Sequence, residues 1–289
     1  MNSLKDSLAF WASIIGTLLG FLGLVRSYTW LTGIGALLLV GSFTAILYAR
    51  RQRQLVLLAA VKVEGRSIDS LNIAGLRRRL NRTLVIQEAS HFAQIDGEDL
   101  AITWQYSGYC RADQEAAMEF SIDTDNNIPF DKLDCFAYDL QHDAHKNHKI
   151  RPILIGPDGM SKKISVPFLE PLSSEQPFKM LLKCELPGCM KGGLEYYTAT
   201  MSFEQEQVHR YSTRLVFLRD RPKWLRVYEC DNSGSVRLLK DLRPLRENQE
   251  LSEYTDVAED VAAKAARIYV FRRAEAIRQS SRPKTHRAA

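Results

Sequence analysis

The hydrophobic pattern divides the chain into two parts near residue 50. Two long apolar runs without a charged residue come first, Leu8–Val25 and Thr29–Tyr48, separated only by Arg26-Ser27-Tyr28. Each run is long enough to cross a hydrocarbon core of about 30 Å as a helix rising about 1.5 Å per residue. Because a backbone in lipid must satisfy its own hydrogen bonds, the pattern predicts an antiparallel pair of transmembrane helices over residues 1–54.

Glycine is concentrated inside these apolar runs. The predicted packing positions are Gly16, Gly20, Gly23, Gly33, Gly35 and Gly41, and the first two form a small-xxx-small pattern. Small residues let helix backbones approach closely, so that dispersion drives their association. Two roles stay open: the glycines seat the helices of one hairpin against each other, or they also allow lateral homo-oligomerisation.

Basic residues at the ends of the runs predict an orientation. Arg50, Arg51 and Arg53 follow the second run, whereas the other end of the hairpin carries only Arg26. The positive-inside rule and attraction to anionic lipid then place both termini in the cytoplasm. The predicted location is the bacterial inner (cytoplasmic) membrane, with the lipid bilayer as a partner.

Residues 55–82 are predicted to be a helical stalk and a basic linker. Leu55–Val63 extends the second apolar run beyond its arginines but is too short for a third span. Leu71–Leu80 has the pattern of a short basic helix with three consecutive bases, Arg77–Arg79.

From residue 83 to 248 the pattern changes to short runs rich in β-branched and aromatic residues, separated by turn residues such as Asp96-Gly97. The candidate strands are Leu84–Ile86, Leu100–Tyr106, Met118–Ile122, Leu133–Leu140, Ile150–Ile155, Ile164–Phe168, Phe178–Leu186, Tyr196–Phe203, Tyr211–Leu218, Trp224–Tyr228 and Val236–Leu239. This spacing is typical of an antiparallel sandwich or barrel. Trp104, Tyr106 and Tyr109 are interpreted as core residues.

The last segment, 249–289, predicts a C-terminal helix over Ser252–Arg278 and a disordered basic tail. Acidic residues crowd the start and basic residues the end, as the helix dipole favours. An apolar stripe at helical spacing supports the helix and consists of Tyr254, Val257, Val261, Ile268 and Phe271. Ile268–Phe271 could instead be a last strand. The predicted fold class is a transmembrane α-hairpin plus a mainly-β cytosolic domain with a C-terminal helix.

Charge and cysteine usage narrow the possible partners. The net charge is +5. Residues 50–82 contain nine Lys/Arg against two acids, whereas residues 83–248 contain twenty against twenty-five. A mildly acidic body argues against a general nucleic-acid binder. The five cysteines form no C-x-x-C pair, which favours reduced thiols in a reducing compartment, with a Cys184–Cys189 bridge as the alternative in an exported domain.

Candidate chemistry is sparse. His142, His145 and His148, with Asp143, have the residue types of a zinc or nickel site. They lie between predicted strands beside lysines and lack a second ligand cluster, so an exposed polar loop is the favoured interpretation and no metal is predicted. The chain has no G-x-S-x-G elbow, Walker A loop, H-E-x-x-H or G-x-G-x-x-G motif. We therefore expect no enzyme and no cofactor.

One basic and aromatic cluster is the candidate ligand site. It consists of Arg219, Arg221, Lys223, Trp224 and Arg226. Guanidinium groups beside an indole suit a phosphorylated, base-containing ligand through ion pairing and stacking. The alternative is a loop that leads into a strand, with the bases pointing to water and Trp224 inward.

The layout of two spans, a stalk and a cytosolic β-rich domain resembles the two-transmembrane, β-rich effectors of bacterial cyclic-oligonucleotide antiphage signalling, the CBASS-like systems. The resemblance covers the hairpin and the strand series. It implies a sensor/effector whose β domain binds a nucleotide signal, such as a cyclic oligonucleotide, and then drives oligomerisation or membrane disruption. The alternative is a membrane-tethered β-sandwich module that recruits a protein partner without a ligand switch.

Overall fold

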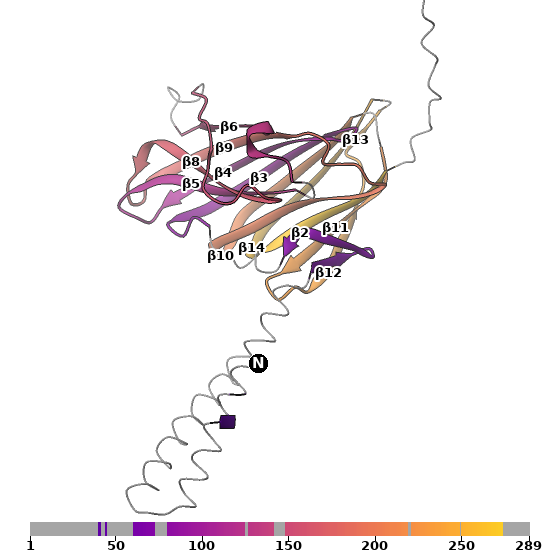
Figure 1. Cartoon of the computed structure of the whole chain (residues 1–289), viewed down its shortest axis with the longest axis horizontal. Helices are drawn as coiled ribbons and strands as arrows, with labels where there is room; N and C mark the ends of the chain where they lie inside the picture. Colours follow the sequence, from indigo (N-terminus) through magenta and orange to yellow (C-terminus); the bar gives the residue numbers. More distant parts are fainter. Residues whose placement is uncertain are drawn as a thin grey trace, which may run out of the picture. The chain divides into compact units, whose positions relative to one another are not determined.

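The computed structural model describes part of the chain, and that part is built almost entirely of β-strands (Figure 1). The described residues are 40–41, 44, 60–72, 80–124, 127–141, 148–218, 221–248 and 250–273. The chain divides into two compact units, 1–59 and 60–289. In the first unit only Val40, Gly41 and Thr44 are described. They are helical, and the Thr44 hydroxyl donates a 2.9 Å hydrogen bond to the carbonyl oxygen of Val40.

The transmembrane hairpin predicted for residues 1–54 is the first correction. No helix in the described part of the chain is long and apolar enough to span a lipid bilayer. Apart from Val40, Gly41 and Thr44, both apolar runs lie outside the described residues, and so do Gly16, Gly20, Gly23, Gly33 and Gly35. An apolar run reports burial without saying what it is buried in, so the pattern alone does not establish a membrane span. For the described residues the fold class is therefore corrected to a mainly-β structure without a membrane-spanning helix.

A sheet of nine strands forms the centre of the second unit, in the order β12-β11-β14-β10-β3-β4-β9-β6, with β13 paired to β14. Neighbours are antiparallel except β10 and β3, which run parallel. Its strands are β3 (Leu84–Asp96), β4 (Asp99–Cys110), β6 (Asp134–Asp139), β9 (Pro177–Leu186), β10 (Leu194–Leu218), β11 (Pro222–Asp231), β12 (Val236–Leu242), β13 (Arg246–Glu247) and β14 (Leu251–Arg273).

Two smaller sheets complete the second unit. One contains β5 (Glu115–Asp123), β8 (Ser161–Leu172) and β7 (Ile153–Leu154) in the order β5-β8-β7. The other is the hairpin of β1 (Ala60–Val63) and β2 (Arg66–Asn72). A short 3-10 helix, η1 (Phe130–Lys132), precedes β6.

A bend in the β10–β14 ribbon folds the large sheet into two layers. The first half of β10, Leu194–Ser202, pairs with the end of β14, and the second half, Gln207–Leu218, pairs with its start. The register breaks between Ser202 and Gln207, and Asp260 on the facing strand has φ 49°. Such bulges bend a ribbon sharply. Tyr211 and Tyr269 lie on opposite halves of the ribbon, yet their hydroxyls are 3.0 Å apart.

The core fills the space between these layers. Phe217 from one half of the ribbon meets Phe271 from the other with ring centroids 4.8 Å apart. The three-stranded sheet packs on β4 through Phe120, whose ring lies 6.4 Å from Trp104 and 5.7 Å from Tyr106. Aromatic pairs at these separations add to the burial of their apolar surface.

The C-terminal helix predicted for Ser252–Arg278 is the second correction, because Leu251–Arg273 is strand β14. This strand lies in the middle of the large sheet, between β10 and β11. Residues 265–271 are all buried, since the folded sheet covers both faces of the strand there. A strand buried on both faces loses the alternation that marks a half-exposed strand. The alternative prediction, a strand over Ile268–Phe271, was correct in type but too short, because the strand begins at Leu251 and ends at Arg273.

The helical stalk predicted for Leu55–Val63 is also wrong where the structure describes it, because Ala60–Val63 is strand β1. The hairpin turn carries Glu64, which has φ 51° and accepts hydrogen bonds from the Tyr228 hydroxyl and, at 2.7 Å, from Arg226. These two donors, Tyr228 first, lower the pKa of the Glu64 carboxyl. The hairpin is thereby attached to β11. Residues 73–79, which include the three consecutive arginines, lie outside the described residues.

The expectation that all cysteines are reduced is wrong for one pair. Cys135 on β6 and Cys184 on β9 are directly opposite in the register, with Cα atoms 4.2 Å apart, and form a disulfide. The pair is distant in sequence, so cysteine spacing gave no signal for it. Cys110 and Cys230 are buried thiols outside any disulfide.

Candidate functional site

A cleft opens where the first half of β10 leaves β3 and crosses over the sheet. Its volume is about 160 Å³. β4 supplies the floor with Leu100, Ile102, Trp104 and Tyr106, and His91 of β3 adjoins them. One wall is the run 119–124 of β5 and the residue after it, and the other is the run 195–200 of β10. Successive side chains of a strand point to opposite faces, yet consecutive residues line each wall. The backbone edge of each strand therefore borders the cleft in addition to one of its faces.

On β5, alternate residues turn their backbone groups toward the cleft. Glu119 shows the direction, because its N–H and C=O bond to the side-chain amide of Asn81 at 2.7 and 2.8 Å instead of to β8. Across the ladder, the carbonyl oxygen of Lys163 accepts a hydrogen bond from Ile155 on the far side of β8. The register pairs Lys163 with Ser121. The antiparallel alternation therefore directs the amide groups of Ser121 away from β8.

On β10, the same reasoning identifies the outward-facing residues. The N–H of Arg273 donates a 2.9 Å hydrogen bond to the carbonyl oxygen of Gly193. The backbone N–H and C=O groups of odd-numbered residues in this half of β10 therefore point toward β14. Thr198 and Thr200 consequently direct their amide groups to the other side. No described strand pairs with β10 on that side over Leu194–Ser202.

The aromatic side chains of the cleft are fixed by hydrogen bonds and ring contacts. The indole Nε1 of Trp104 donates a 2.8 Å hydrogen bond to the Tyr197 hydroxyl, and the Trp104 ring stacks near Phe120. Trp104 therefore contacts both walls. Tyr106 meets Phe203 edge to face at 5.6 Å. Burial raises the pKa of the Tyr106 and Tyr197 hydroxyls well above the usual range, so both are neutral hydrogen-bonding groups.

His91 is the buried titratable group of the cleft. Its Nε2 shares a 2.9 Å hydrogen bond with the Tyr106 hydroxyl, while its Nδ1 is buried without a protein partner. Burial lowers the pKa of the imidazole to about 3, so the ring is neutral at physiological pH. A neutral imidazole offers one donor and one acceptor. An unsatisfied buried ring nitrogen costs free energy.

Charged residues also line the cleft. Among the described lining residues, Glu119, Asp123 and Glu195 are acidic and Lys163 is basic. Lys163 Nζ lies 2.7 Å from Glu119 Oε2, so these two charges are paired. Glu195 is 3% exposed and accepts a hydrogen bond from the Gly192 N–H. Asp123 and Glu195 both have further partners within the chain, so the number of carboxylates does not set the charge that a ligand meets.

The basic cluster predicted as a ligand site lies elsewhere, on and before β11. Arg221 pairs with Glu247 at 2.9 Å, and Arg226 pairs with Glu64 at 2.7 Å and with Asp241 at 3.0 Å. The Arg226 guanidinium also lies 4.8 Å from the Trp224 ring, so these two side chains share one face. The cluster is therefore occupied by carboxylates of the same chain. Lys223 is exposed, and Arg219 lies outside the described residues.

The histidine tract shows no metal site in the described part. His142 and His145 lie outside the described residues, and His148 alone is described. The described residues contain no group of three or more His, Cys, Asp or Glu side chains arranged to hold a metal ion.

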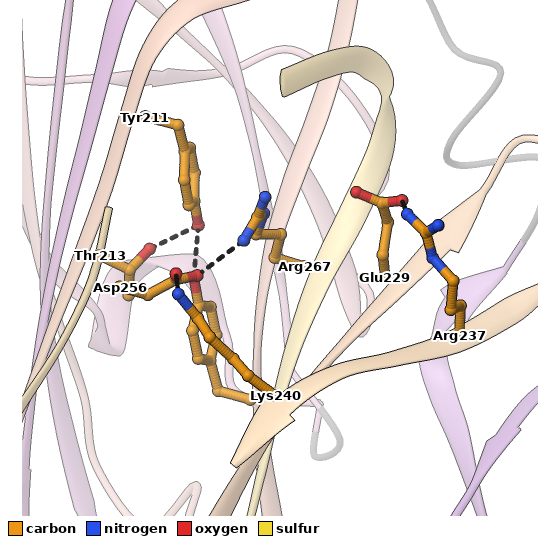
Figure 2. Close-up of polar contacts among 8 residues, drawn as sticks. Tyr211, Thr213, Glu229, Arg237, Lys240, Asp256 and Arg267 are labelled. Atoms are coloured by element: carbon orange, nitrogen blue, oxygen red, sulfur yellow. Dashed lines mark hydrogen bonds and ion pairs between the residues drawn. The ribbon is translucent and has the colours of Figure 1, made fainter. Parts of the chain in front are cut away.

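A second polar cluster lies inside the bend of the β10–β14 ribbon (Figure 2). The Asp256 side chain is fully buried, and its Oδ2 accepts hydrogen bonds from Arg267 at 3.0 Å and from the Tyr269 hydroxyl at 2.7 Å. Lys240 Nζ lies 2.6 Å from Oδ1. Burial raises the pKa of this carboxyl, but Lys240, Tyr269 and Arg267 together lower it below the ordinary value. This cluster joins β12 to both halves of β14, so we assign it a structural role.

Comparisons with known proteins identify no family. No family model and no curated protein matches the chain. Among solved structures, it is similar to the M1 zinc metallopeptidase from Deinococcus radiodurans, with a TM-score of 0.43 and 12% identity over 66% of this chain and 43% of that chain. A mutant of the same enzyme gives a TM-score of 0.42 and 13% identity over the same shares. The chain thus spans less than half the length of these structures, and the likeness assigns it no function.

Sequence reasoning placed the cleft aromatics correctly in the core and missed the cleft itself. Trp104 and Tyr106 were interpreted as core residues, and both are partly or fully buried, whereas Tyr109, interpreted in the same way, is half-buried and lies outside the core cluster. Their partners Phe120 and Tyr197 come from strands far along the chain. The one available signal was the polar His91 within an apolar strand pattern, because a buried histidine needs a partner.

Proposed function

We propose that the β-strand unit is a binding module and that the cleft between β5 and β10 is its ligand site. The observation that carries the proposal is a concave, aromatic-lined cleft bordered by His91, whose buried Nδ1 has no hydrogen-bond partner among the described residues. Binding sites are typically apolar hollows with a few convergent polar groups. The ligand we infer carries a planar or apolar group that fits among Trp104, Phe120 and Tyr197.

Size limits the ligand further. A volume of about 160 Å³ is below the range of about 300–1,000 Å³ for drug-sized ligands, which suits a single ring or one side chain. This volume is too small for a whole nucleotide. A nucleotide signal, expected from the sequence, would have to use the β11 cluster, whose arginines would first have to leave Glu247, Glu64 and Asp241. Nucleotide sensing stays a prediction.

Thermal-shift and NMR titrations of the full chain test the proposal, with indole and benzylammonium as cleft probes and AMP as the phosphate probe. A probe at 10 mM with a Kd of 1 mM should stabilise the protein by about 1.4 kcal/mol, which raises the melting temperature by a few degrees. We expect indole and benzylammonium to bind and AMP not to bind.

A matched pair of variants localises the binding. Ala199→Leu adds volume to the cleft wall, where Ala199 is 1% exposed, and should abolish the shift from indole. Arg226→Ala removes a base of the β11 cluster, far along the sheet order from β4, and should leave that shift unchanged. Absence of a shift with either aromatic probe would contradict the proposal. A shift with AMP that Arg226→Ala removes would favour the nucleotide sensor.

A further inference from the structure

We propose that the ligand of the cleft is an extended peptide segment of a partner protein, which adds as a strand along the exposed edges of β5 and β10 and inserts one apolar side chain into the cavity. This inference rests on the proposed function and names its partner class. Strand addition gives affinity through backbone hydrogen bonds and specificity through pockets for alternate side chains.

The first support is that both walls present main-chain hydrogen-bonding groups. Ser121 on β5 and Thr198 and Thr200 on β10 direct their amide groups away from their own sheet partners, as the ladder bonds at Lys163 and Arg273 show. Such a row of amide groups is a template for another chain. A rigid small molecule with a single ring satisfies few of these groups, whereas an extended peptide supplies a donor and an acceptor every second residue.

The second support is that this chain already uses side-chain amides as substitute strands beside the cleft. Asn81 bonds both backbone groups of Glu119 on β5, at 2.7 and 2.8 Å. Gln205 does the same for Ile86 on β3, where β10 departs: its Oε1 accepts from the Ile86 N–H at 2.8 Å, and its Nε2 donates to the Ile86 carbonyl oxygen. A side-chain amide has the donor and acceptor of a peptide group. The backbone groups of Glu119 on β5 and of Ile86 on β3 therefore each bind an amide. On β5, Ser121 is the next residue after Glu119 whose backbone groups point away from β8.

The third support is the apolar floor of the cleft. In an added strand, successive side chains point to opposite faces. If one apolar side chain enters the cavity among Trp104, Phe120 and Tyr197, its neighbours point away from the floor. The partner segment therefore carries an aromatic or aliphatic residue flanked by polar residues.

Selection from a phage-displayed library of random nine-residue peptides on the full chain tests the inference. The selected peptides are then tested for binding to two variants of Ser121. Ser121→Pro removes an N–H that makes no bond to β8, so the β5–β8 ladder stays intact, while Ser121→Ala keeps that N–H. Proline is tolerated on such an outward edge. Indole binding and the melting temperature show whether each variant keeps its fold and its cleft.

We expect enriched peptides with an apolar residue between polar ones that bind wild type and Ser121→Ala equally. Ser121→Pro should bind them about tenfold more weakly, because a lost backbone hydrogen bond costs about 1.4 kcal/mol. N-methylation of alternate amides of the best peptide should weaken it likewise. The inference is overturned if no peptide is enriched on wild type, or if the selected peptides bind folded Ser121→Pro as tightly as wild type. Because indole is measured separately, its binding alongside a peptide failure would leave the small-ligand site standing.

Discussion

At the scale of single residues, the burial of His91 determines its protonation state in the folded protein. The groups packed against it are Trp104, Tyr106 and Tyr211, with ring centroids between 5.6 and 6.0 Å from the imidazole. None of them carries a charge that would stabilise an imidazolium, since burial also raises the pKa values of both tyrosines. The folded protein therefore holds His91 neutral over the range in which an unfolded histidine takes up a proton.

This difference predicts a pH dependence of stability. The pKa of His91 is lowered to about 3 in the folded protein from 6.5 in the reference state. Below pH 6.5 the unfolded chain binds the proton and the folded one does not, so the free energy of unfolding falls as the pH falls, by about 1.4 kcal/mol per unit down to about pH 3. At pH 5 the free energy of unfolding is therefore about 2 kcal/mol lower than at neutral pH because of His91.

Urea unfolding at pH 7.5 and pH 5.0 measures this effect in wild type and in His91→Phe. The variant should lose about 2 kcal/mol less than wild type between the two conditions, because the carboxylates common to both proteins cancel in the comparison. His209→Gln, which replaces a histidine that is 74% exposed, is the control for the loss of an imidazole from the surface. Equal pH dependence in wild type and His91→Phe would show that the imidazole is not held neutral.

The same residue scale shows why the cleft could not be predicted. The alternation in LAITWQY places Trp104 and Tyr106 on one inward face, and the structure agrees. Whether an inward aromatic is fully packed or lines a hollow depends on what covers it. Here the cover consists of Phe120 and Tyr197, and the gap between them exists because β10 bends away at Ser202–Gln207. Local pattern contains no information on that bend.

At the scale of elements, β10 and β14 show how far periodicity reaches. The pattern predicted two strands, Tyr196–Phe203 and Tyr211–Leu218, and the structure joins them into one strand of 25 residues. Residues 204–210 were assigned to neither strand, whereas Gln207, Val208 and Arg210 pair with β14 and the residues before them span the register break. In β14, helix-favouring alanines and apolar spacing of three, four and seven residues imitated a helix. Burial on both faces accounts for Ile268 and Phe271 of that stripe, whereas Val257 is 54% exposed, so the spacing did not mark one buried helical face.

The buried cluster at the bend gives a prediction at this scale. Asp256→Asn removes the one negative charge that faces Arg267, whose side chain is 9% exposed, and leaves that guanidinium buried without a counter-charge. Removing one partner of a buried ion pair costs about 3–5 kcal/mol. Urea unfolding at pH 7.5 should show a loss of this size. Because the cluster holds the two halves of the ribbon together (Figure 2), we also expect the variant to weaken indole binding at the cleft.

The control for this variant is a similar change at an exposed pair. Asp241 is 70% exposed and pairs with Arg226, so Asp241→Asn should cost less than about 1 kcal/mol. If Asp256→Asn were no more destabilising than Asp241→Asn, the cluster would not be what holds the bend.

At the scale of the whole molecule, the strand order of the large sheet differs most from the sequence prediction, which was a β domain over residues 83–248 followed by a separate C-terminal helix. The last described strand is central: β14 lies between β10 and β11 and also pairs with β13. The parallel pairing of β10 with β3 joins segments more than a hundred residues apart. Such long-range pairings depend on the register of the whole sheet, which short-range sequence signals do not encode.

This topology predicts how the protein responds to truncation. A chain ending at Glu250 loses β14, so β10 and β11 lose their shared partner and the buried run 265–271 is missing from the core. We expect this chain to show no cooperative urea transition, whereas a chain ending at Arg273 keeps every described strand and should unfold like the full chain. An appended helix on a complete β domain would instead tolerate removal. A cooperative transition with an unchanged midpoint for the chain ending at Glu250 would contradict the central position of β14, and with it the bent ribbon that forms one wall of the cleft.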